Sequence, residues 1–173
     1  MSPNAIATVP GTLLAVAGRG LLLTGDSGTG KSDIVLGLLD RGHQLIADDA
    51  VELFLHHGEL HGRCPEALRG LLAIRGLGVL DVAELFGHDR LRASQRIDLE
   101  IALIAAPPPA DPLMVDWSNR SIMGITIPCL RLPAMGNRDL PLLVETAVKM
   151  HAKPGVQATW PGTTAQGPGG KED

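Results

Sequence analysis

The segment Leu21–Ser32 reads Leu-Leu-Leu-Thr-Gly-Asp-Ser-Gly-Thr-Gly-Lys-Ser and decides the fold. Its first four residues form a short apolar run that ends at a glycine, which predicts a strand. Residues 25–32 fit the pattern G-x-x-x-x-G-K-[ST], and the apolar spacing after them predicts a helix over Ser32–Leu39. A strand, a glycine-rich loop and a helix in this order are typical of a phosphate-binding P-loop.

The residue types in this loop suit the binding of a polyphosphate. Glycines let backbone N–H groups turn inward around an anion, and the helix N-terminus adds a partial positive charge. Lys31 offers an ammonium group to the phosphates, and the hydroxyl of Ser32 can ligate Mg²⁺. The alternative is a glycine-rich turn with a solvated lysine. The predicted phosphate-binding residues are Gly25, Asp26, Ser27, Gly28, Thr29, Gly30, Lys31 and Ser32.

Two adjacent carboxylates, Asp48 and Asp49, follow the predicted strand Gln44–Ala47. Carboxylates at the end of a strand beside a P-loop lie where Mg²⁺ and an attacking hydroxyl would meet. Neighbouring residues of a strand point to opposite faces, so only one of the two faces the phosphates unless the strand ends there. The alternative is an aspartate pair that only forms a turn.

Two arginines are further candidates. Arg75 precedes Gly76-Leu77-Gly78 on a predicted bend, and Arg138 precedes the predicted amphipathic helix Leu140–Met150. A guanidinium at either place could hold a phosphate or a partner carboxylate, or it could be a solvated surface group. His57 and His61 are four residues apart but flank a predicted turn, so the sequence does not favour a zinc site.

The remaining pattern predicts one α/β domain with a P-loop and a mixed sheet with flanking helices. Residues 1–153 form the predicted domain and residues 154–173 a flexible tail, because the tail is rich in Gly, Pro, Thr and Gln. Met1–Pro10 reads as a poorly specified lead-in. The further predicted elements are strands at Thr12–Val16, Leu71–Ile74, Arg96–Ala105 and Ile122–Leu130, a hairpin of Val51–Leu55 and Leu60–Arg63, and a short helix at Asp81–Phe86.

Composition excludes several classes of function. The chain has 173 residues with a formal net charge of -4 and only 2% aromatic residues, which argues against a nucleic-acid partner. No apolar run reaches the ~20 residues of a membrane span, and no secretory signal is visible. The two cysteines, Cys64 and Cys129, form no disulfide framework. We therefore expect a cytoplasmic protein without a membrane partner.

These motifs, in this order, resemble the catalytic domain of HPr kinase/phosphorylase. The resemblance covers most of the chain, from about Gly11 to Lys149, and Arg-Gly-Leu-Gly at its distance from the P-loop is its most specific part. The chain resembles a short form of the family, which lacks the amino-terminal domain. The matching segments are Gly25–Ser32, Arg41–Asp49, Ile74–Val82, Leu85–Gly87, Ile97–Leu99, Arg138 and Leu140–Glu145.

The resemblance implies an HPr kinase/PEP carboxykinase-like fold and an enzyme that phosphorylates a serine of the phosphocarrier HPr with ATP and Mg²⁺. It also implies phosphorolysis of the phosphoserine and assembly into a homo-oligomer, a hexamer in the family. By the same resemblance, Lys31 binds phosphate, Ser32 and Asp48 serve the metal, and Asp49 accepts the serine proton. Arg138 matches a catalytic arginine, and Arg75 lies in a segment that both reaction directions need.

Two positions depart from the family pattern. Pro10 stands where the family usually has a histidine, and Ala73 stands where it has a glutamate counted as a Mg²⁺ ligand. Three hypotheses therefore remain: an HPr kinase with little phosphorylase activity, a catalytically impaired nucleotide-binding regulatory module, and a kinase for a different acceptor. The retained Asp48-Asp49 pair favours a kinase, because a module that only binds nucleotide needs no proton acceptor.

Overall fold

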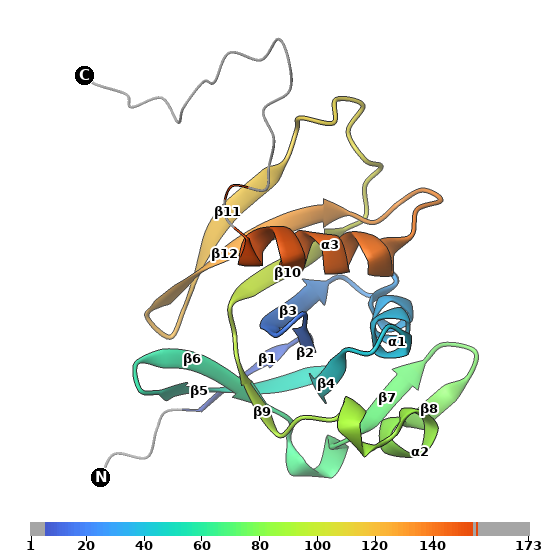
Figure 1. The fold of residues 1–173 in the computed structure, drawn as a ribbon, viewed down its shortest axis with the longest axis vertical. Coiled ribbons are helices and arrows are strands. Elements are labelled where there is room, and N and C mark those ends of the chain that lie inside the picture. The colour runs from blue at the N-terminus through green and yellow to red at the C-terminus, as the bar shows by residue number, and fades with distance from the viewer. Residues whose placement is uncertain (1–5, 154, 156–173) are drawn as a thin grey trace.

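The central element is a six-stranded mixed sheet (Figure 1). The computed structural model describes residues 6–153 and 155. Across the sheet the strands follow the order β11 (Asp116–Ile122), β12 (Ile125–Pro133), β10 (Leu99–Ile104), β3 (Arg19–Gly25), β2 (Thr12–Val16) and β4 (Gln44–Ala47).

Three neighbouring strands of this sheet are parallel. Strand β10 pairs in parallel with both β3 and β12, whereas β2, β4 and β11 join the sheet in antiparallel fashion. The carboxyl ends of β3, β10 and β12 therefore lie at the same edge of the sheet. Ligands of α/β proteins bind at such an edge, outside the carboxyl ends of parallel strands.

Helices cover one face of the sheet. α1 (Lys31–Asp40) and α3 (Leu140–Ala152) pack against aliphatic side chains of β2, β3 and β10, which form the larger hydrophobic core. The two helices approach each other closely, because a Cβ at Gly37 of α1 would lie 2.5 Å from Cγ of Pro141 in α3. This contact fixes α3 against the helix that follows the P-loop.

A four-stranded antiparallel sheet covers part of the opposite face. Its order is β1 (Ala7–Pro10), β5 (Ala50–His56), β6 (Glu59–Arg63) and β9 (Ser94–Arg96). Leu13 and Leu22 of the central sheet pack there against Val51, Leu53 and Leu60, which forms a second core. The domain thus has three layers in this region, with helices, the mixed sheet and the antiparallel sheet in turn.

A separate hairpin lies beside α1. It consists of β7 (Leu71–Ile74) and β8 (Gly78–Asp81), and Leu72 and Ile74 of β7 reach into the larger core. The short helix α2 (Val82–Phe86) follows, with Asp81 accepting a hydrogen bond from the backbone N–H of Glu84 at 3.1 Å. Single turns of 3-10 helix occur at η1 (Glu66–Leu68) and η2 (His88–Arg90).

Most predicted elements are confirmed, including the P-loop strand and helix, the β5–β6 hairpin and the carboxy-terminal helix. Three predictions are wrong. Ala7–Pro10 of the supposed lead-in is strand β1, which pairs with β5. Arg96–Ala105 is not one strand, because β9 and β10 belong to different sheets. Strand β12 begins at Ile125 rather than Ile122, and β11 before it was not predicted.

The predicted flexible tail, residues 154–173, lies outside the described residues except for Gly155. Within residues 6–153, no helix is long and apolar enough to cross a membrane.

Candidate phosphate-binding site

The glycine-rich loop connects the carboxyl end of β3 to the first turn of α1, as predicted. Strand β3 ends at Gly25, and α1 begins at Lys31. Gly28 and Gly30 have φ values of 85° and 88°, a backbone conformation that side-chain-bearing residues rarely adopt. The backbone N–H of Ile34 donates to the carbonyl of Gly30 at 3.1 Å, so Gly30 is the residue from which the helix starts.

The loop fits a phosphate group on geometric grounds. A Cβ built at Gly28 or Gly30 would meet no atom within 4 Å, so open space lies beside the backbone at both glycines. An anion placed there would face the free N–H groups at the start of α1, where the helix dipole is positive. The residues present therefore suit a nucleotide polyphosphate.

Hydrogen bonds within the loop hold its shape. Lys31 Nζ donates to the carbonyl oxygen of Gly25 at 2.6 Å, which folds the lysine side chain back along the loop. The buried hydroxyl of Thr29 donates to the carbonyl of Asp26 at 2.7 Å. The ammonium group of Lys31 is consequently held against the same loop that offers the backbone cradle.

Asp48 lies at the end of β4, with its carboxylate held from two sides. The Thr12 hydroxyl, on a side chain that is 1% exposed, donates to Oδ1 of Asp48 at 2.9 Å. The backbone N–H of Ala73 in β7 also donates to this carboxylate. Burial is the main influence on the carboxyl group and raises its pKa above the ordinary value, while both hydrogen bonds act in the opposite direction.

Asp49 is exposed and lies in a strained turn. Its φ is 69°, and the backbone N–H of Ala50 donates to the carbonyl of Asp48 at 2.8 Å, which closes a γ-turn centred on Asp49. The backbone N–H of Gly11 donates to the carbonyl of Asp49 at 3.2 Å. This strained turn lies where the chain passes from the mixed sheet to the antiparallel sheet, and strain of this kind is concentrated at functional sites.

One hollow of about 640 Å³ brings most of the predicted site together. Asp48 and Asp49 therefore share this space with the glycine-rich loop, which confirms that the acidic pair and the loop adjoin. The site residues that line it are Gly25, Asp26, Ser27, Lys31, Ser32, Asp48 and Asp49. The γ-turn lets both aspartates reach the hollow, which an ordinary strand would not allow.

The two positions that depart from the family pattern also line this hollow. Pro10 and Ala73 line the hollow with apolar side chains that have no titratable group. Sequence reasoning did not predict Thr12, although a threonine in an otherwise apolar strand is a signal for a buried hydrogen bond. Leu68, Leu71 and Val79, which complete one wall, gave no signal in the sequence.

The two arginines are not among the residues that line the hollow. Arg75 is exposed in the β7–β8 turn, where the backbone N–H of Leu77 donates to the carbonyl of Ile74 at 3.0 Å. Arg138 is exposed in the loop between β12 and α3. Because β12 is parallel to β10 and β3, this loop leaves the sheet at the same edge as the P-loop.

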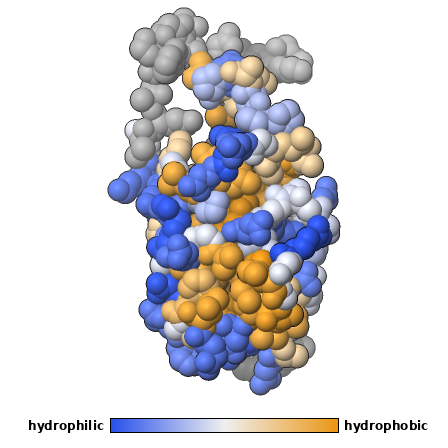
Figure 2. Space-filling view, turned by 90° about the vertical axis from the view of Figure 1, so that its right-hand side faces the viewer, coloured by the Kyte–Doolittle hydropathy of each residue, from blue (hydrophilic) through white to orange (hydrophobic). Residues whose placement is uncertain are grey.

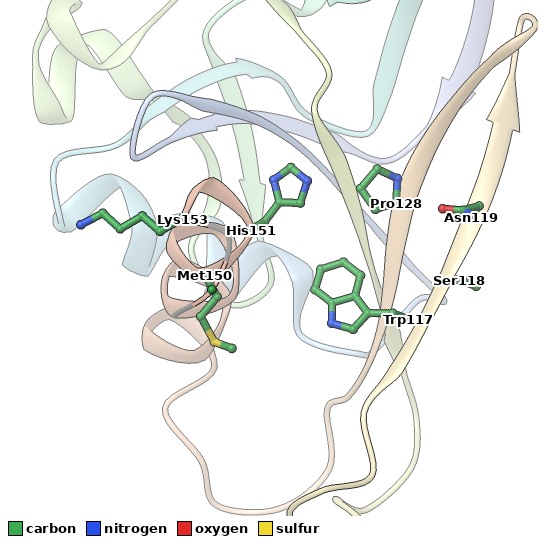
Figure 3. Close-up of a pocket in the computed structure, with 8 residues that line it drawn as sticks. Trp117, Ser118, Asn119, Pro128, Met150, His151 and Lys153 are labelled. Atoms are coloured by element: carbon green, nitrogen blue, oxygen red, sulfur yellow. The ribbon is translucent and has the colours of Figure 1, made fainter. Parts of the chain in front are cut away.

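A second hollow, of about 470 Å³, lies between β11 and the carboxyl end of α3 (Figure 3). Trp117 and Pro128 face His151 across it, and Met150 lies at its side. It contains none of the predicted site residues. Within residues 6–153 and 155, no group of three or more His, Cys, Asp or Glu side chains is placed so that it could hold a metal ion.

A glycine-rich loop between a parallel strand and a helix, with two carboxylates on the same hollow, defines a P-loop α/β protein. Comparisons with known proteins specify the family. The family model of the HPr Serine kinase C-terminal domain matches residues 4–159. The chain belongs to this family, as the resemblance of its motifs predicted.

Relatives and a solved structure agree with this assignment. HPr kinase/phosphorylase of Xylella fastidiosa is 38% identical over 151 residues, which cover 84% of this chain and 48% of the relative. The protein of that name from Bordetella pertussis is 41% identical over 145 residues, covering 82% and 47%. The chain thus spans about half the length of the curated relatives that it matches. The Hpr(Ser) kinase/phosphatase structure from Coxiella burnetii is 37% identical with a TM-score of 0.79, covering 84% of this chain and 90% of that chain.

Proposed function

We propose that this protein is an ATP-dependent kinase that phosphorylates a serine of the phosphocarrier protein HPr. The observation that supports this function most directly is the placement of Asp49 on the same hollow as Lys31 and the P-loop. A proton acceptor and a phosphate cradle that share one water-accessible space are the minimum for phosphoryl transfer to a hydroxyl. Family membership supports the choice of HPr as the acceptor.

Each residue of the hollow has a role that follows from its position. When bound, ATP supplies the γ-phosphoryl group, and Mg²⁺ neutralises the charge that develops during its transfer. The N–H groups from Gly25 to Ser32 hold the phosphates, and Lys31 adds a positive charge beside them. Ser32 and Asp48 would hold the metal. Asp49 takes the proton of the acceptor serine, for which its exposed position is suited.

The two arginines complete the proposed site from outside the hollow. Arg138 lies in the loop that follows β12 at the P-loop edge of the sheet. Arg75 lies in the turn of the β7–β8 hairpin, whose strands line the hollow. Both are exposed, so each can reach a phosphate or an acceptor protein without first leaving a buried position. We also propose that the chain self-associates, as the family resemblance implies.

The test is phosphoryl transfer from γ-labelled ATP to HPr in the presence of Mg²⁺. Wild type should label HPr, and Asp49→Asn should lose at least 100-fold in rate, the scale of general base catalysis. Asparagine tolerates the positive φ at this position, so the variant separates the lost proton acceptor from lost folding. Asp40→Asn, an exposed position at the end of α1, is the matched control. Full labelling by Asp49→Asn would contradict the proposed role.

A nucleotide-binding regulatory module is the second candidate, and one observation favours it. Pro10 and Ala73, which replace a histidine and a glutamate of the family pattern, both face the hollow. They leave the phosphate loop complete while removing two groups that could serve turnover. Binding of ATP by calorimetry without transfer to HPr would support this candidate, and transfer to another protein would indicate a different acceptor. Release of pyrophosphate from phosphorylated HPr and inorganic phosphate tests the reverse reaction.

A further inference from the structure

A carboxylate is buried in the strand next to the one that leads into the phosphate-binding loop. Hydrophilic residues make up much of the surface in Figure 2, and glutamate is rarely buried unless it is paired. Glu100 of β10 is nevertheless only 3% exposed, and in the parallel register it lies opposite Leu22 of β3 and Cys129 of β12. A carboxylate in such surroundings loses its hydration, which costs free energy unless a cation and hydrogen bonds replace the water.

Glu100 has one partner on each side of its strand. Arg120 Nη1 of β11 and the hydroxyl of Thr24 in β3 both donate to Oε1 of Glu100, each at 2.6 Å. Replacing a buried ion pair by packed apolar side chains is often neutral or stabilising. Stability therefore does not explain why a glutamate occupies this position, and the hydrogen bond to Thr24 indicates a different role.

Thr24 connects Glu100 to the start of the phosphate-binding loop. It is the residue before Gly25, where β3 ends, and the carbonyl oxygen of Gly25 accepts the hydrogen bond of Lys31 Nζ at 2.6 Å. Strand β10 also abuts this junction farther along, because a Cβ built at Gly25 would lie 2.8 Å from the carbonyl oxygen of Leu103. Strand β10 thus holds the junction at two points, with a side chain at Glu100 and with backbone at Leu103.

The charge of Glu100 also matters for a polyphosphate. A carboxylate without a cation beside it would repel phosphates, since a protein interior screens charge weakly. Arg120 cancels this charge, although its strand β11 is separated from β10 by β12. The Arg120 side chain is 41% exposed, so the ion pair reaches from the surface to the buried carboxylate.

We propose that Glu100 is a positioning residue for the phosphate-binding loop and acts through Thr24. Its carboxylate fixes the Thr24 side chain, and thereby the end of β3 at which the Gly25 carbonyl holds the ammonium group of Lys31. Arg120 removes the repulsion that the carboxylate would otherwise exert on the phosphates. This inference rests on the proposed function, because it takes the loop as the nucleotide site, and it adds residues outside the hollow that set nucleotide affinity.

The test compares ADP affinity, measured by calorimetry with Mg²⁺, with the free energy of urea unfolding in the same full-chain variants. Thr24→Val and Glu100→Leu each remove one side of the hydrogen bond and should weaken ADP binding about fivefold. The double variant should lose no more than either single change, because both act on one contact. Glu100→Gln keeps an acceptor for Thr24 and should stay within twofold of wild type. Asp116→Leu, which removes a carboxylate of β11 whose partner is Arg131 of β12, is the matched control and should bind ADP as wild type does.

A second pair of variants tests the charge. Arg120→Met leaves the Glu100 carboxylate without its cation and should weaken ADP binding at least fivefold. Adding Glu100→Gln to Arg120→Met should restore most of this loss, because the buried charge is then absent. A double variant that binds ADP no better than Arg120→Met would contradict the role assigned to the ion pair.

The other outcomes contradict the proposal in distinct ways. Unchanged ADP affinity in Thr24→Val and Glu100→Leu, whatever the change in unfolding, would make Glu100 a purely structural residue. Additive losses in the double variant would show that Glu100 does not act through Thr24. If Glu100→Leu does not fold, Thr24→Val and Glu100→Gln decide the question. Wild type that binds no ADP would overturn the loop assignment together with this inference, whereas wild type that binds ADP without phosphorylating HPr would contradict the proposed function alone.

Discussion

Thr12 donates a hydrogen bond from its buried hydroxyl to Oδ1 of Asp48 at 2.9 Å, and this bond links the second strand to the candidate metal ligand. The Ala73 N–H donates to the same carboxylate from the neighbouring hairpin. Asp48 is thus oriented by two groups that belong to different elements. Such outer partners fix the geometry of a metal-binding carboxylate and tune its basicity.

Thr12→Val should therefore weaken metal-dependent binding while preserving the fold. Valine replaces the hydroxyl at almost equal volume, and the loss of one hydrogen bond should reduce Mg²⁺-dependent ADP affinity about fivefold, or ~1 kcal/mol. Calorimetric titration with and without Mg²⁺ measures this change. Thr146→Val, at an exposed position of α3, should have no effect on it. Unchanged Mg²⁺ dependence in Thr12→Val would show that the hydroxyl does not serve Asp48.

The pH dependence of the same binding should shift upward in Thr12→Val. Burial already raises the pKa of Asp48, and the Thr12 hydrogen bond acts to lower it. A metal requires the carboxylate, so Mg²⁺-dependent binding falls as pH decreases through this pKa. Without the hydroxyl the pKa rises further, and the midpoint of the loss moves to higher pH. ADP titrations from pH 4 to 8 measure the midpoint, and a downward shift would contradict this account.

Gly28→Ala should abolish nucleotide binding at a small cost in stability. The φ of 85° makes alanine unfavourable by about 1–2 kcal/mol, but no neighbouring atom obstructs its Cβ. The methyl group would instead occupy the space that we assign to phosphate. Circular dichroism should show a folded variant, and calorimetry should show no ADP binding. Gly58→Ala provides the matched control, because Gly58 has a similar φ of 75° and similar open space in the β5–β6 turn.

The strand–loop–helix unit could be predicted from the sequence because glycine spacing and apolar runs are local signals. The break between β9 and β10 could not, since Ile97 and Asp98 continue the same alternation. Their backbone N–H groups donate to Leu60 and Gly20, respectively, which belong to different sheets. Only tertiary contacts reveal that the chain changes sheets there.

The burial of a charged side chain in β10 could not be predicted from the local sequence either. Glu100 stands between the apolar residues Leu99 and Ile101, a pattern typical of a strand with one face in solvent, yet Glu100 is 3% exposed and accepts hydrogen bonds at 2.6 Å from both Thr24 and Arg120. Strand β11 carries Arg120 and was missed because its largely exposed residues lack an apolar pattern. The strained φ of Asp49 likewise has no signal in the sequence. The acidic pair was predictable as a motif, whereas its shared access to the hollow depends on the γ-turn.

Gly37→Ala should destabilise the protein, although alanine usually stabilises a helix relative to glycine. The added Cβ would lie 2.5 Å from Cγ and 2.8 Å from Cβ of Pro141, and a proline ring cannot rotate away. Overpacking of this kind should cost about 1–3 kcal/mol in urea unfolding. The double variant Gly37→Ala/Pro141→Ala should recover part of the loss. A stabilised single variant would mean that α1 and α3 separate easily.

Glu145 of α3 should contribute stability that is lost in acid. Its carboxylate accepts hydrogen bonds from Arg41 and from Lys149, the latter at 2.7 Å, and lies 2.9 Å from Nε2 of His43. These partners hold the pKa of Glu145 far below its ordinary value, led by Arg41. A lowered pKa stabilises the folded state above the unfolded-state pKa of about 4.3, and this contribution declines as pH falls below that value. Glu145→Gln should therefore lower the free energy of unfolding, measured with urea at pH 7, by about 2 kcal/mol. The difference from wild type should shrink progressively below pH 4, whereas Glu84→Gln, at an exposed position of α2, should match wild type throughout. A deficit that stays constant down to pH 3 would attribute the effect of Glu145 to packing instead of charge.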